Sequence, residues 1–227
     1  ANRWSLCTLG ISVCLSGGRS MEEQRWLKTL RNCQSLLQVS EFAATCQRCP
    51  LRKGCRQVVV SAGVTSAKLM LIGEGPGADE DAQGLPFVGK AGQLLDNILH
   101  AGGFSRQNNV YITNVVKCRP PGNRIPTEEE RQACLPILRQ QYRLLQPKIV
   151  LLLGATAVQT VIDPQARITK VRGQWVEKDG VWFMPTYHPA ALLRNEMLKK
   201  DVWDDMKQVI QRYREVVDAN HFPKRKI

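Results

Sequence analysis

The chain has 227 residues, of which 32 are Lys or Arg and 20 are Asp or Glu, so its formal net charge is +12. Its 43% hydrophobic and 23% charged residues exclude a disordered or collagen-like chain, and no apolar run reaches the roughly 20 residues that a membrane span needs. The positive excess favours a polyanionic partner, because Lys and Arg gain affinity for nucleic acid by displacing counterions from its phosphates.

The first 20 residues differ in character from the rest of the chain. Residues 6–15 form an apolar stretch similar to that of a signal peptide, but polar and small residues interrupt it. We therefore expect residues 1–20 to be a disordered extension without function, in which Cys7 and Cys14 carry no chemistry, and Met21 to be the working start.

The folded part of the chain is expected to begin with a helix. Acidic residues follow Met21 at once, which suits the positive end of a helix dipole, and apolar residues then recur at helical spacing. This stripe comprises Trp26, Leu30, Cys33 and Leu37. We expect residues 21–220 to form a single domain and residues 221–227 to be a basic, solvated tail.

Short apolar runs alternate with helical segments through the rest of the chain. The apolar runs predict buried strands at 68–73, 110–115, 148–154 and 181–186. The helical segments are 89–101, 127–146, 155–162 and 190–217, the last broken near Lys200. Thr127 and Glu130 form a capping box at the start of the second helix. This order predicts a three-layer α/β/α sandwich with a mainly parallel central sheet.

The residues that follow the predicted strands are informative, because open α/β sheets bind ligands beyond the carboxyl ends of their strands. A glycine-rich, acidic segment, 73–81, follows the first strand, and Asn114 ends the second. Gly154 ends the third strand, and residues 187–189 follow the fourth. We expect all four to face one crevice.

The first of these segments also satisfies the pattern G-x-G-x-x-A of dinucleotide-binding loops. Glu74 and the acidic run 79–81 oppose this interpretation, since a pyrophosphate would meet negative charge there. Pro76 removes a backbone donor, and residues 83–89 delay the next predicted helix. We therefore expect no nucleotide cofactor.

Four cysteines have a spacing that suits a metal centre. Cys46 and Cys49 form a C-x-x-C pair, and Cys118 and Cys134 lie far downstream. Four such thiolates could hold a zinc ion or an iron–sulfur cluster, and the spacing alone also allows unrelated buried cysteines. Disulfides are less favoured, because we expect a cytoplasmic protein. Two further thiols have other expected places: Cys55, which could compete as a ligand, and Cys33, in the core.

Four ordered motifs together resemble the family 4 uracil-DNA glycosylases. They are Gly73-Glu74-Gly75-Pro76-Gly77, Gln83-Gly84-Leu85-Pro86-Phe87-Val88-Gly89-Lys90-Ala91-Gly92-Gln93-Leu94-Leu95, Thr113-Asn114-Val115-Val116-Lys117-Cys118-Arg119-Pro120-Pro121 and His188-Pro189-Ala190-Ala191-Leu192-Leu193-Arg194. The resemblance covers about residues 42–217. One departure is Gly75, where the family more often has Ala.

The resemblance implies a monofunctional glycosylase that flips uracil out of DNA and hydrolyses its N-glycosidic bond, leaving an abasic site for base excision repair. It also implies a structural [4Fe-4S] cluster on Cys46, Cys49, Cys118 and Cys134, with Cys55 outside the ligand pattern. The expected partner is uracil-containing DNA, single- or double-stranded, and the expected state is a monomer.

The crevice residues suit this chemistry, which expels an anionic base from a cationic sugar. Phe87 could stack on the extruded base, although without the motif it would be taken for a core aromatic. Asn114 offers a donor and an acceptor that match O4 and N3–H of uracil, although alone it could be a turn residue. His188, with a backbone N–H of Gly75, could donate to O2, and Glu74 could orient the water or stabilise the sugar cation.

Residues around the crevice have more general expected roles. Gly77 belongs to the substrate-binding loop, and Glu80 or Asp81 could crowd the 5-methyl group of thymine. After the catalytic His, the segment 192–194 could enter the minor groove, with Leu192 and Leu193 filling the gap and Arg194 meeting phosphate. Basic residues of the cysteine loop suit backbone contacts with DNA: Arg48, Arg52, Lys53 and Arg56.

Two other classes of protein remain open at this point. A noncatalytic nucleic-acid-binding protein stabilised by zinc or iron–sulfur would explain the charge and the cysteines, but not the crevice residues. An iron–sulfur oxidoreductase with a dinucleotide would explain the glycine-rich loop. Neither accounts for Phe87, Asn114 and His188 in one crevice, so the glycosylase is the preferred interpretation.

Overall fold

The computed structural model describes residues 20–224 and is built around one six-stranded sheet in the order β1-β3-β2-β4-β6-β5. The four inner strands are parallel, and the two edge strands run antiparallel to their neighbours. The strands are β1 (Ala62–Gly63), β2 (Leu69–Gly73), β3 (Val110–Asn114), β4 (Ile149–Leu153), β5 (Val176–Lys178) and β6 (Val181–Thr186). The predicted strands are therefore confirmed as the parallel core of the sheet.

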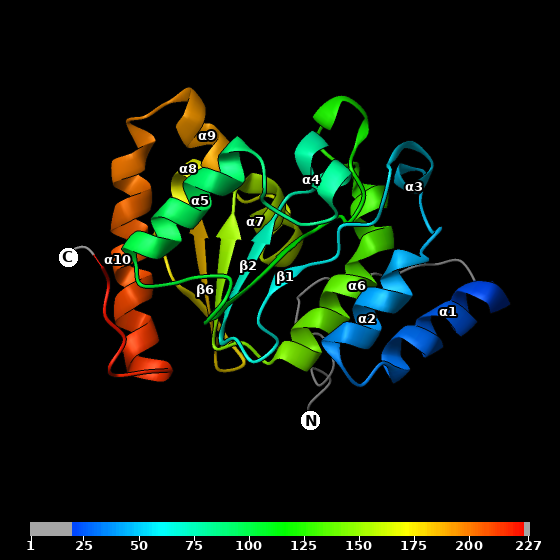
Figure 1. The fold of residues 1–227 in the computed structure, drawn as a ribbon, viewed down its shortest axis with the longest axis horizontal. Coiled ribbons are helices and arrows are strands. Elements are labelled where there is room, and N and C mark those ends of the chain that lie inside the picture. Colours follow the sequence, from blue (N-terminus) through cyan, green and yellow to red (C-terminus); the bar gives the residue numbers. More distant parts are fainter. Residues whose placement is uncertain (1–19, 225–227) are drawn as a thin grey trace.

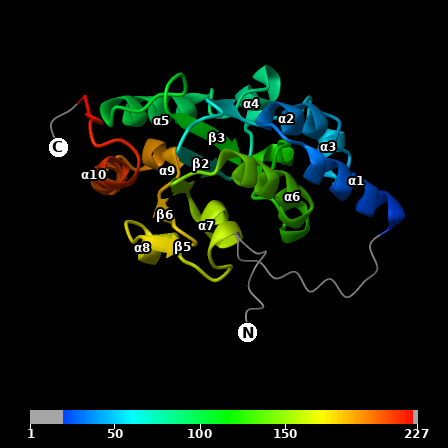
Figure 2. The ribbon, with the colours of Figure 1, turned by 90° about the horizontal axis from the view of Figure 1, so that it is seen from below.

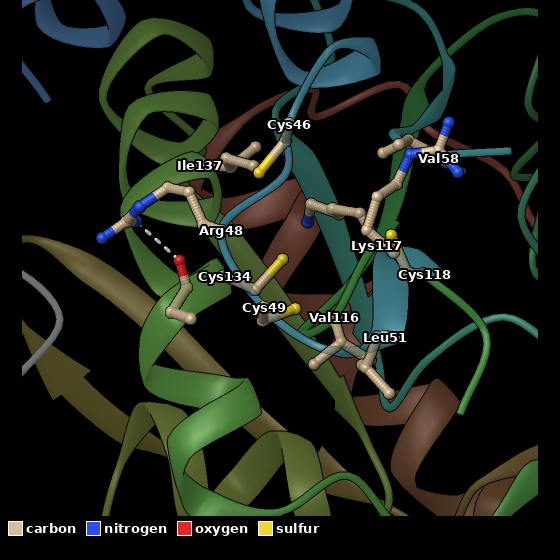
Figure 3. Close-up of a pocket in the computed structure, with 12 residues that line it drawn as sticks. Cys46, Arg48, Cys49, Leu51, Val58, Val116, Lys117, Cys118, Cys134 and Ile137 are labelled. Carbon is tan, nitrogen blue, oxygen red and sulfur yellow. Dashed lines mark hydrogen bonds between the residues drawn. The ribbon is translucent and has the colours of Figure 1, made fainter. Parts of the chain in front are cut away.

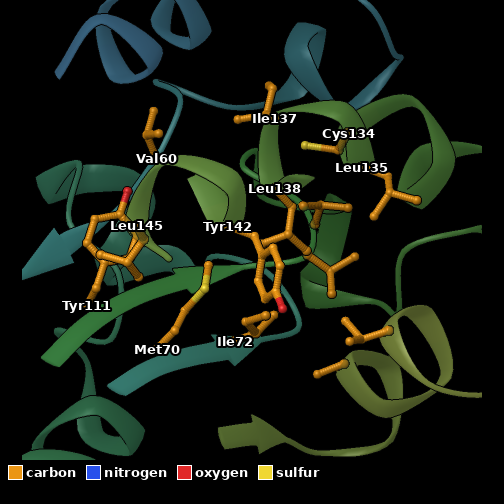
Figure 4. Packing of buried hydrophobic residues seen from close by; sticks show 14 of the residues in the cluster. Val60, Met70, Ile72, Tyr111, Cys134, Leu135, Ile137, Leu138, Tyr142 and Leu145 are labelled. Atoms are coloured by element: carbon orange, nitrogen blue, oxygen red, sulfur yellow. The ribbon is translucent and has the colours of Figure 1, made fainter. Parts of the chain in front are cut away.

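Helices cover both faces of the sheet, because alternate side chains of each buried strand point to opposite sides. Met70 and Ile72 of β2 pack with α6, whereas Leu69 and Leu71 pack with α5 and α10. Figure 2 shows α5, α9 and α10 on one side of the sheet and α6 and α7 on the other, and Figure 4 shows α6 over the first face. The three-layer α/β/α sandwich is confirmed.

The helices follow the predicted order with a few differences. They are α1 (Met21–Asn32), α2 (Leu36–Ala44), α3 (Leu51–Gly54), α4 (Ala78–Gln83), α5 (Lys90–Ala101), η1 (Pro121–Asn123), α6 (Glu128–Leu145), α7 (Ala155–Val161), α8 (Ile168–Val171), α9 (Pro189–Arg194) and α10 (Leu198–Val216). The capping box of Thr127 and Glu130 is present, and the long last segment breaks at 195–197.

Two helix predictions were wrong in detail. The apolar stripe from Trp26 does not run on to Leu37: Ser35 caps a second helix, its hydroxyl accepting from the Gln38 N–H, and Leu37 points to solvent. A helix does start soon after β2, at Ala78, because Glu80 bonds back to the N–H of the capping Gly77. The argument from a missing helix against a dinucleotide loop therefore fails, while the acidic run and Pro76 still oppose it.

The two chain ends bear on the predicted domain limits. Residues 1–19 and 225–227, which include most of the predicted extension and the last three residues of the predicted tail, lie outside the described residues. His221 is buried, its ring stacks on Phe104 at 4.3 Å, and its Nε2 lies 2.8 Å from the Gly102 carbonyl oxygen. The first residues of the predicted tail therefore pack on the domain. No helix between residues 20 and 224 is long and apolar enough to span a membrane.

Candidate active site

A pocket of about 540 Å³ opens beyond the carboxyl ends of the inner strands, where the arrows of Figure 1 point. We call it the crevice pocket. It brings together eight of the predicted site residues: Glu74, Gly75, Gly77, Glu80, Phe87, Asn114, His188 and Arg194. Residues from four separate strand ends thus meet around one cavity, as the alternation of strands and helices predicts.

Asn114, the last residue of β3, presents an unpaired acceptor to the crevice pocket. Its side chain is 1% exposed, and its Oδ1 is buried without a hydrogen-bond partner. A Cβ on Gly73 would lie 2.4 Å from this oxygen and 2.5 Å from Cζ of Phe87, so the glycine makes room for both groups. A buried acceptor left unpaired is costly, and a ligand with an N–H donor would satisfy it.

Phe87 lies in a loop that other residues hold in place. Its φ of 56° is unusual for a residue with a side chain, and its carbonyl oxygen accepts from Nη2 of Arg106, whose Nη1 donates to the Pro86 carbonyl at 2.5 Å. A Cβ on Gly92 would lie 1.9 Å from the Phe87 carbonyl oxygen, so only glycine fits at this position in the first turn of α5. The Phe87 ring centre lies 5.5 Å from that of His188, which places two rings along one wall.

Glu80 and Gly77 support this loop, and this narrows the roles predicted for them. One Glu80 oxygen accepts from the N–H groups of Val88 and Gly89 at 2.9 Å, and the other accepts from the Gly77 N–H at 3.1 Å. Glu80 lines the pocket, but its oxygens are engaged, and the Gly77 N–H is not free for a substrate. The prediction for Asp81 was wrong, since it is buried away from the pocket and caps the Arg56 N–H at 2.9 Å.

His188 follows β6 and is held as a neutral ring with a known tautomer. Its Nδ1 accepts from the Ala190 N–H at 3.2 Å, so the proton lies on Nε2. Burial, aided by the positive charge of Arg194, lowers the pKa of His188 to about 4, and Glu80 opposes this shift. Gly154 has a φ of +91° and packs against His188, because a Cβ on this residue would lie only 2.9 Å from the His188 Cβ. His188 is therefore a neutral hydrogen-bond donor at neutral pH.

Glu74 has a partner that the sequence analysis missed. The Thr156 hydroxyl, in the first turn of α7, donates to Oε2 of Glu74, and both residues line the crevice pocket. The sequence places Thr156 after the end of β4, as it places Glu74 after the end of β2, but their contact depends on packing. Residues 123–125 also form part of the pocket wall, and no pattern in the sequence had indicated them.

Gly75 also lines the pocket, and its lack of a side chain fits its surroundings. A Cβ at this position would lie 2.7 Å from Cγ2 of Val116, a branched side chain that cannot easily turn away. The departure from Ala noted in the sequence is therefore accompanied by close packing against Val116.

Helix α9 exposes one of the two leucines predicted to contact DNA and buries the other. Leu192 is 1% exposed and packs in the core, so its side chain cannot enter a groove in this conformation. Leu193 is 49% exposed, and Arg194 is exposed at the pocket mouth. The prediction for Leu192 is corrected because the helical turn directs it inward and leaves Leu193 and Arg194 at the surface.

A second, smaller pocket lies beside the first, and Cys46, Cys49, Cys118 and Cys134 all line it. Figure 3 shows these thiols, which come from the 46–55 loop, the segment after β3 and helix α6. We call it the cysteine pocket. Within residues 20–224, no group of three or more His, Cys, Asp or Glu side chains is close enough to hold a single metal ion. The ligand set thus stays a prediction.

The cysteine pocket contains buried thiols and one buried ammonium group. Burial and the other cysteines raise the pKa of Cys118, and burial raises that of Cys134 to about 11. Lys117 lines the same pocket, is fully buried, and donates to Thr113 Oγ1 at 2.8 Å and to the Asn114 carbonyl oxygen, both neutral. Burial lowers the pKa of Lys117 to about 8, while Cys134 acts in the opposite direction. A buried ammonium group without an opposite charge is energetically costly, and metal-bound thiolates would provide that negative charge.

Other groups near this pocket are structural. Arg48 donates to the Ala133 carbonyl at 2.7 Å, pairs with Glu23 at 2.8 Å and stacks over Trp26, so it fastens α1 to α6 and is not free for DNA. Cys33 is buried in the core, as predicted. Cys55 approaches Cys118, raising its pKa, but does not line the pocket.

Comparisons with known proteins agree with this geometry. The profile of the uracil DNA glycosylase superfamily matches residues 60–207. A type-4 uracil-DNA glycosylase of Thermotoga maritima is 44% identical over 174 residues, which cover 75% of this chain and 90% of that protein. One of Sulfurisphaera tokodaii is 40% identical over 77% of this chain and 83% of its own length. A type-5 uracil-DNA glycosylase of Pyrobaculum aerophilum is 33% identical over 57% of this chain and 64% of that protein.

Proposed function

Because the chain belongs to the uracil-DNA glycosylase superfamily and is similar to type-4 members over three quarters of its length, we propose that it excises uracil from DNA. It flips the nucleotide into the crevice pocket and hydrolyses the N-glycosidic bond, leaving an abasic site for base excision repair. It acts as a monofunctional glycosylase and as a monomer, on single- or double-stranded DNA.

The observation that carries this proposal is the unpaired Oδ1 of Asn114 beside Phe87. Uracil offers N3–H, a donor for this oxygen, and O4, an acceptor for the amide N–H of the same side chain. Cytosine has the opposite pattern at these two positions and would leave both polar groups unpaired. The Phe87 ring, held by Glu80 and Arg106, gives the flipped base a face on which to stack.

His188 serves the departing base. Its Nε2–H donates to O2 of uracil, where negative charge grows as the bond from C1′ to N1 breaks. A neutral ring can donate this hydrogen bond without giving up its proton, and the low pKa of His188 keeps the ring neutral. The base therefore leaves as a stabilised anion and takes its proton from solvent afterwards.

Glu74 serves the sugar. As the base leaves, positive charge grows at C1′, and a carboxylate nearby stabilises that charge and accepts a hydrogen bond from the attacking water. The water oxygen bonds to C1′, and its proton passes to the carboxylate and then to solvent. No electron is transferred, so the reaction needs no redox partner.

We propose further that the four cysteines hold a [4Fe-4S] cluster that cross-links the 46–55 loop, the segment after β3 and helix α6. The buried, unpaired charge of Lys117 supports an anionic centre there. Thiols that share a pocket without converging on one ion suit a cluster of several irons better than a single zinc, which draws four sulfurs to about 2.3 Å from its centre. Iron and sulfide analysis of anaerobically purified protein tests this, and stoichiometric zinc would contradict it.

The glycosylase proposal is tested on DNA that carries one uracil, with matched thymine and cytosine strands. We expect uracil-dependent strand cutting that requires alkali, because an abasic site breaks only under base. A protein that binds these strands without creating alkali-sensitive sites would instead be a noncatalytic nucleic-acid-binding module, in which Glu74 and His188 would have no role.

A further inference from the structure

We propose that Thr156 is a positioning residue for the reaction: its hydroxyl fixes one oxygen of Glu74 so that the other faces the sugar and its attacking water. This inference rests on the proposed function. It concerns a residue that none of the sequence motifs contains, and it follows from how two neighbouring strands end.

The fold itself brings the two residues together. Strands β2 and β4 are parallel neighbours, paired from Leu69 with Ile149 to Ile72 with Leu152. Glu74 directly follows β2, and Thr156 lies in the first turn after β4, so both leave the sheet at the same edge. The Thr156 hydroxyl donates to Oε2 of Glu74 across 82 residues of sequence. The contact therefore joins two elements of the core, not two mobile loops.

Thr156 is held more rigidly than Glu74. It is 5% exposed, and its own carbonyl oxygen accepts from the Thr160 hydroxyl at 2.7 Å, one turn further along α7. A β-branched side chain on a helix has few rotamers, so the position of its hydroxyl is set by the backbone. Gly154, with its φ of +91°, makes the turn that starts this helix beside His188.

Glu74, in contrast, is a flexible side chain at the wall of a wide pocket. Within residues 20–224, Thr156 is the group that donates to its carboxylate, and Arg or Lys side chains pair with other acids. A carboxylate on three rotatable bonds loses conformational entropy when it is ordered. Because the hydrogen bond to a fixed hydroxyl orders Glu74 before the substrate binds, less entropy is lost on binding. With Oε2 engaged, Oε1 remains to accept from water at C1′.

The hydroxyl takes no part in the proton balance. During hydrolysis the water proton passes to Glu74 and then to solvent, and the Thr156 proton stays on its own oxygen throughout. Removing the hydroxyl should therefore slow the chemical step while leaving the binding of DNA and the stacking of the base unchanged.

The experiment compares Thr156→Val, which keeps the shape and loses the hydroxyl, with Thr156→Ser, which keeps the hydroxyl. Thr29→Val is the control, because it makes the same change on helix α1, where the hydroxyl donates to the Arg25 carbonyl oxygen of its own helix and lines neither pocket. We expect Thr156→Val to lower kcat for uracil excision by about 10- to 100-fold with KM changed by less than about twofold. Thr156→Ser should keep the rate within about threefold of the wild type, and Thr29→Val should have the wild-type rate.

A double substitution shows whether Thr156 acts through Glu74. In a Glu74→Gln background, Thr156→Val should lower the residual rate by less than about twofold, because the group that it orients is already gone. Multiplicative losses would overturn the proposal, as would a Thr156→Val enzyme as active as the wild type, or a loss confined to KM. A wild type that fails to excise uracil would refute the proposed function itself, whereas an active wild type with an equally active Thr156→Val refutes only the role of Thr156.

Discussion

Two pockets lie near the end of β3, and they are built in different ways. Asn114 lines the crevice pocket, whereas Val116, Lys117 and Cys118 line the cysteine pocket. Several residues of the crevice pocket lie at strand ends and are held by hydrogen bonds: the Phe87 loop donates to Glu80, and Thr156 donates to Glu74. The thiols of the cysteine pocket come from loops and a helix outside the sheet, and no disulfide joins these four cysteines.

This difference shows what holds the residues of each pocket in place. The side chains of the crevice pocket are held by protein contacts, and the acceptor Oδ1 of Asn114 is left unpaired, so that a base can bind to it. The cysteine pocket holds four thiols and the buried ammonium of Lys117, and in our proposal a centre that binds four thiolates completes it. We therefore assign the chemistry to the first pocket and the stability of the fold to the second, and four predictions follow from that assignment.

The largest effect is expected from Asn114→Asp. The new carboxylate offers uracil O4 no donor, so we expect the single-turnover excision rate to fall by at least about 100-fold. Asn97→Asp is the control, since it makes the same change on the exposed face of α5. Excision that is equally fast in both variants would remove the basis for uracil recognition by Asn114.

Cys134→Ala is expected to act on the fold. We expect it to lose bound iron and to lower the free energy of unfolding by about 3 kcal/mol, which corresponds to about 6–12 °C in Tm for a chain of this size. Cys33→Ala removes a buried thiol outside the cysteine pocket and should keep its iron. Equal iron content in the two variants would contradict the assigned ligand set.

Leu193→Ala should have a smaller effect that lies in binding. This exposed leucine, which precedes the pocket residue Arg194, can enter the gap left by the flipped nucleotide, so its loss should raise KM for double-stranded uracil DNA by about 5- to 10-fold. Leu37→Ala, an equally simple change at an exposed leucine on α2, should leave KM unchanged. Similar KM values for both variants would exclude Leu193 from the DNA interface.

The smallest expected effect concerns His188 and pH. Its folded pKa of about 4 lies below the ordinary value of 6.5, so the unfolded chain binds the proton more readily between these values. Stability should therefore be lost as the pH falls from about 6.5 toward 4. The free energy of unfolding is measured by denaturation at pH 7.5 and at pH 5. Its decrease between the two should be larger by about 1 kcal/mol in the wild type than in His188→Gln, after allowance for partial exposure. Equal losses would mean that the ring is not held neutral.

The sequence predicted the parallel strands well because each is buried on both faces and is read as an unbroken apolar run. It missed β1 and β5, which are short, lie at the edges and are partly exposed. It missed α4, since the cap of that helix is a glycine whose partner, Glu80, looked like a pocket residue.

The candidate site was predicted in the same uneven way. The rule that strand ends face one crevice located Glu74, Asn114 and His188, which the structure brings together. It could not tell which neighbouring side chain on a helix points inward, so Leu192 and Leu193 were both predicted to contact DNA, although Leu192 is buried and Leu193 is exposed. Nor could it find contacts between distant segments, such as Thr156 with Glu74 or Arg106 with Phe87, because these depend on packing and not on spacing.

The central claim is that the crevice pocket breaks the bond between uracil and its sugar, and the most direct test is to identify the base that is set free. The protein is incubated with DNA that contains uracil, thymine and cytosine in one strand, and the small molecules are separated and weighed by mass spectrometry. We predict free uracil in equal amount to the abasic sites, with no free thymine or cytosine. Intact DNA with no free base, or release of thymine and cytosine along with uracil, would contradict the account.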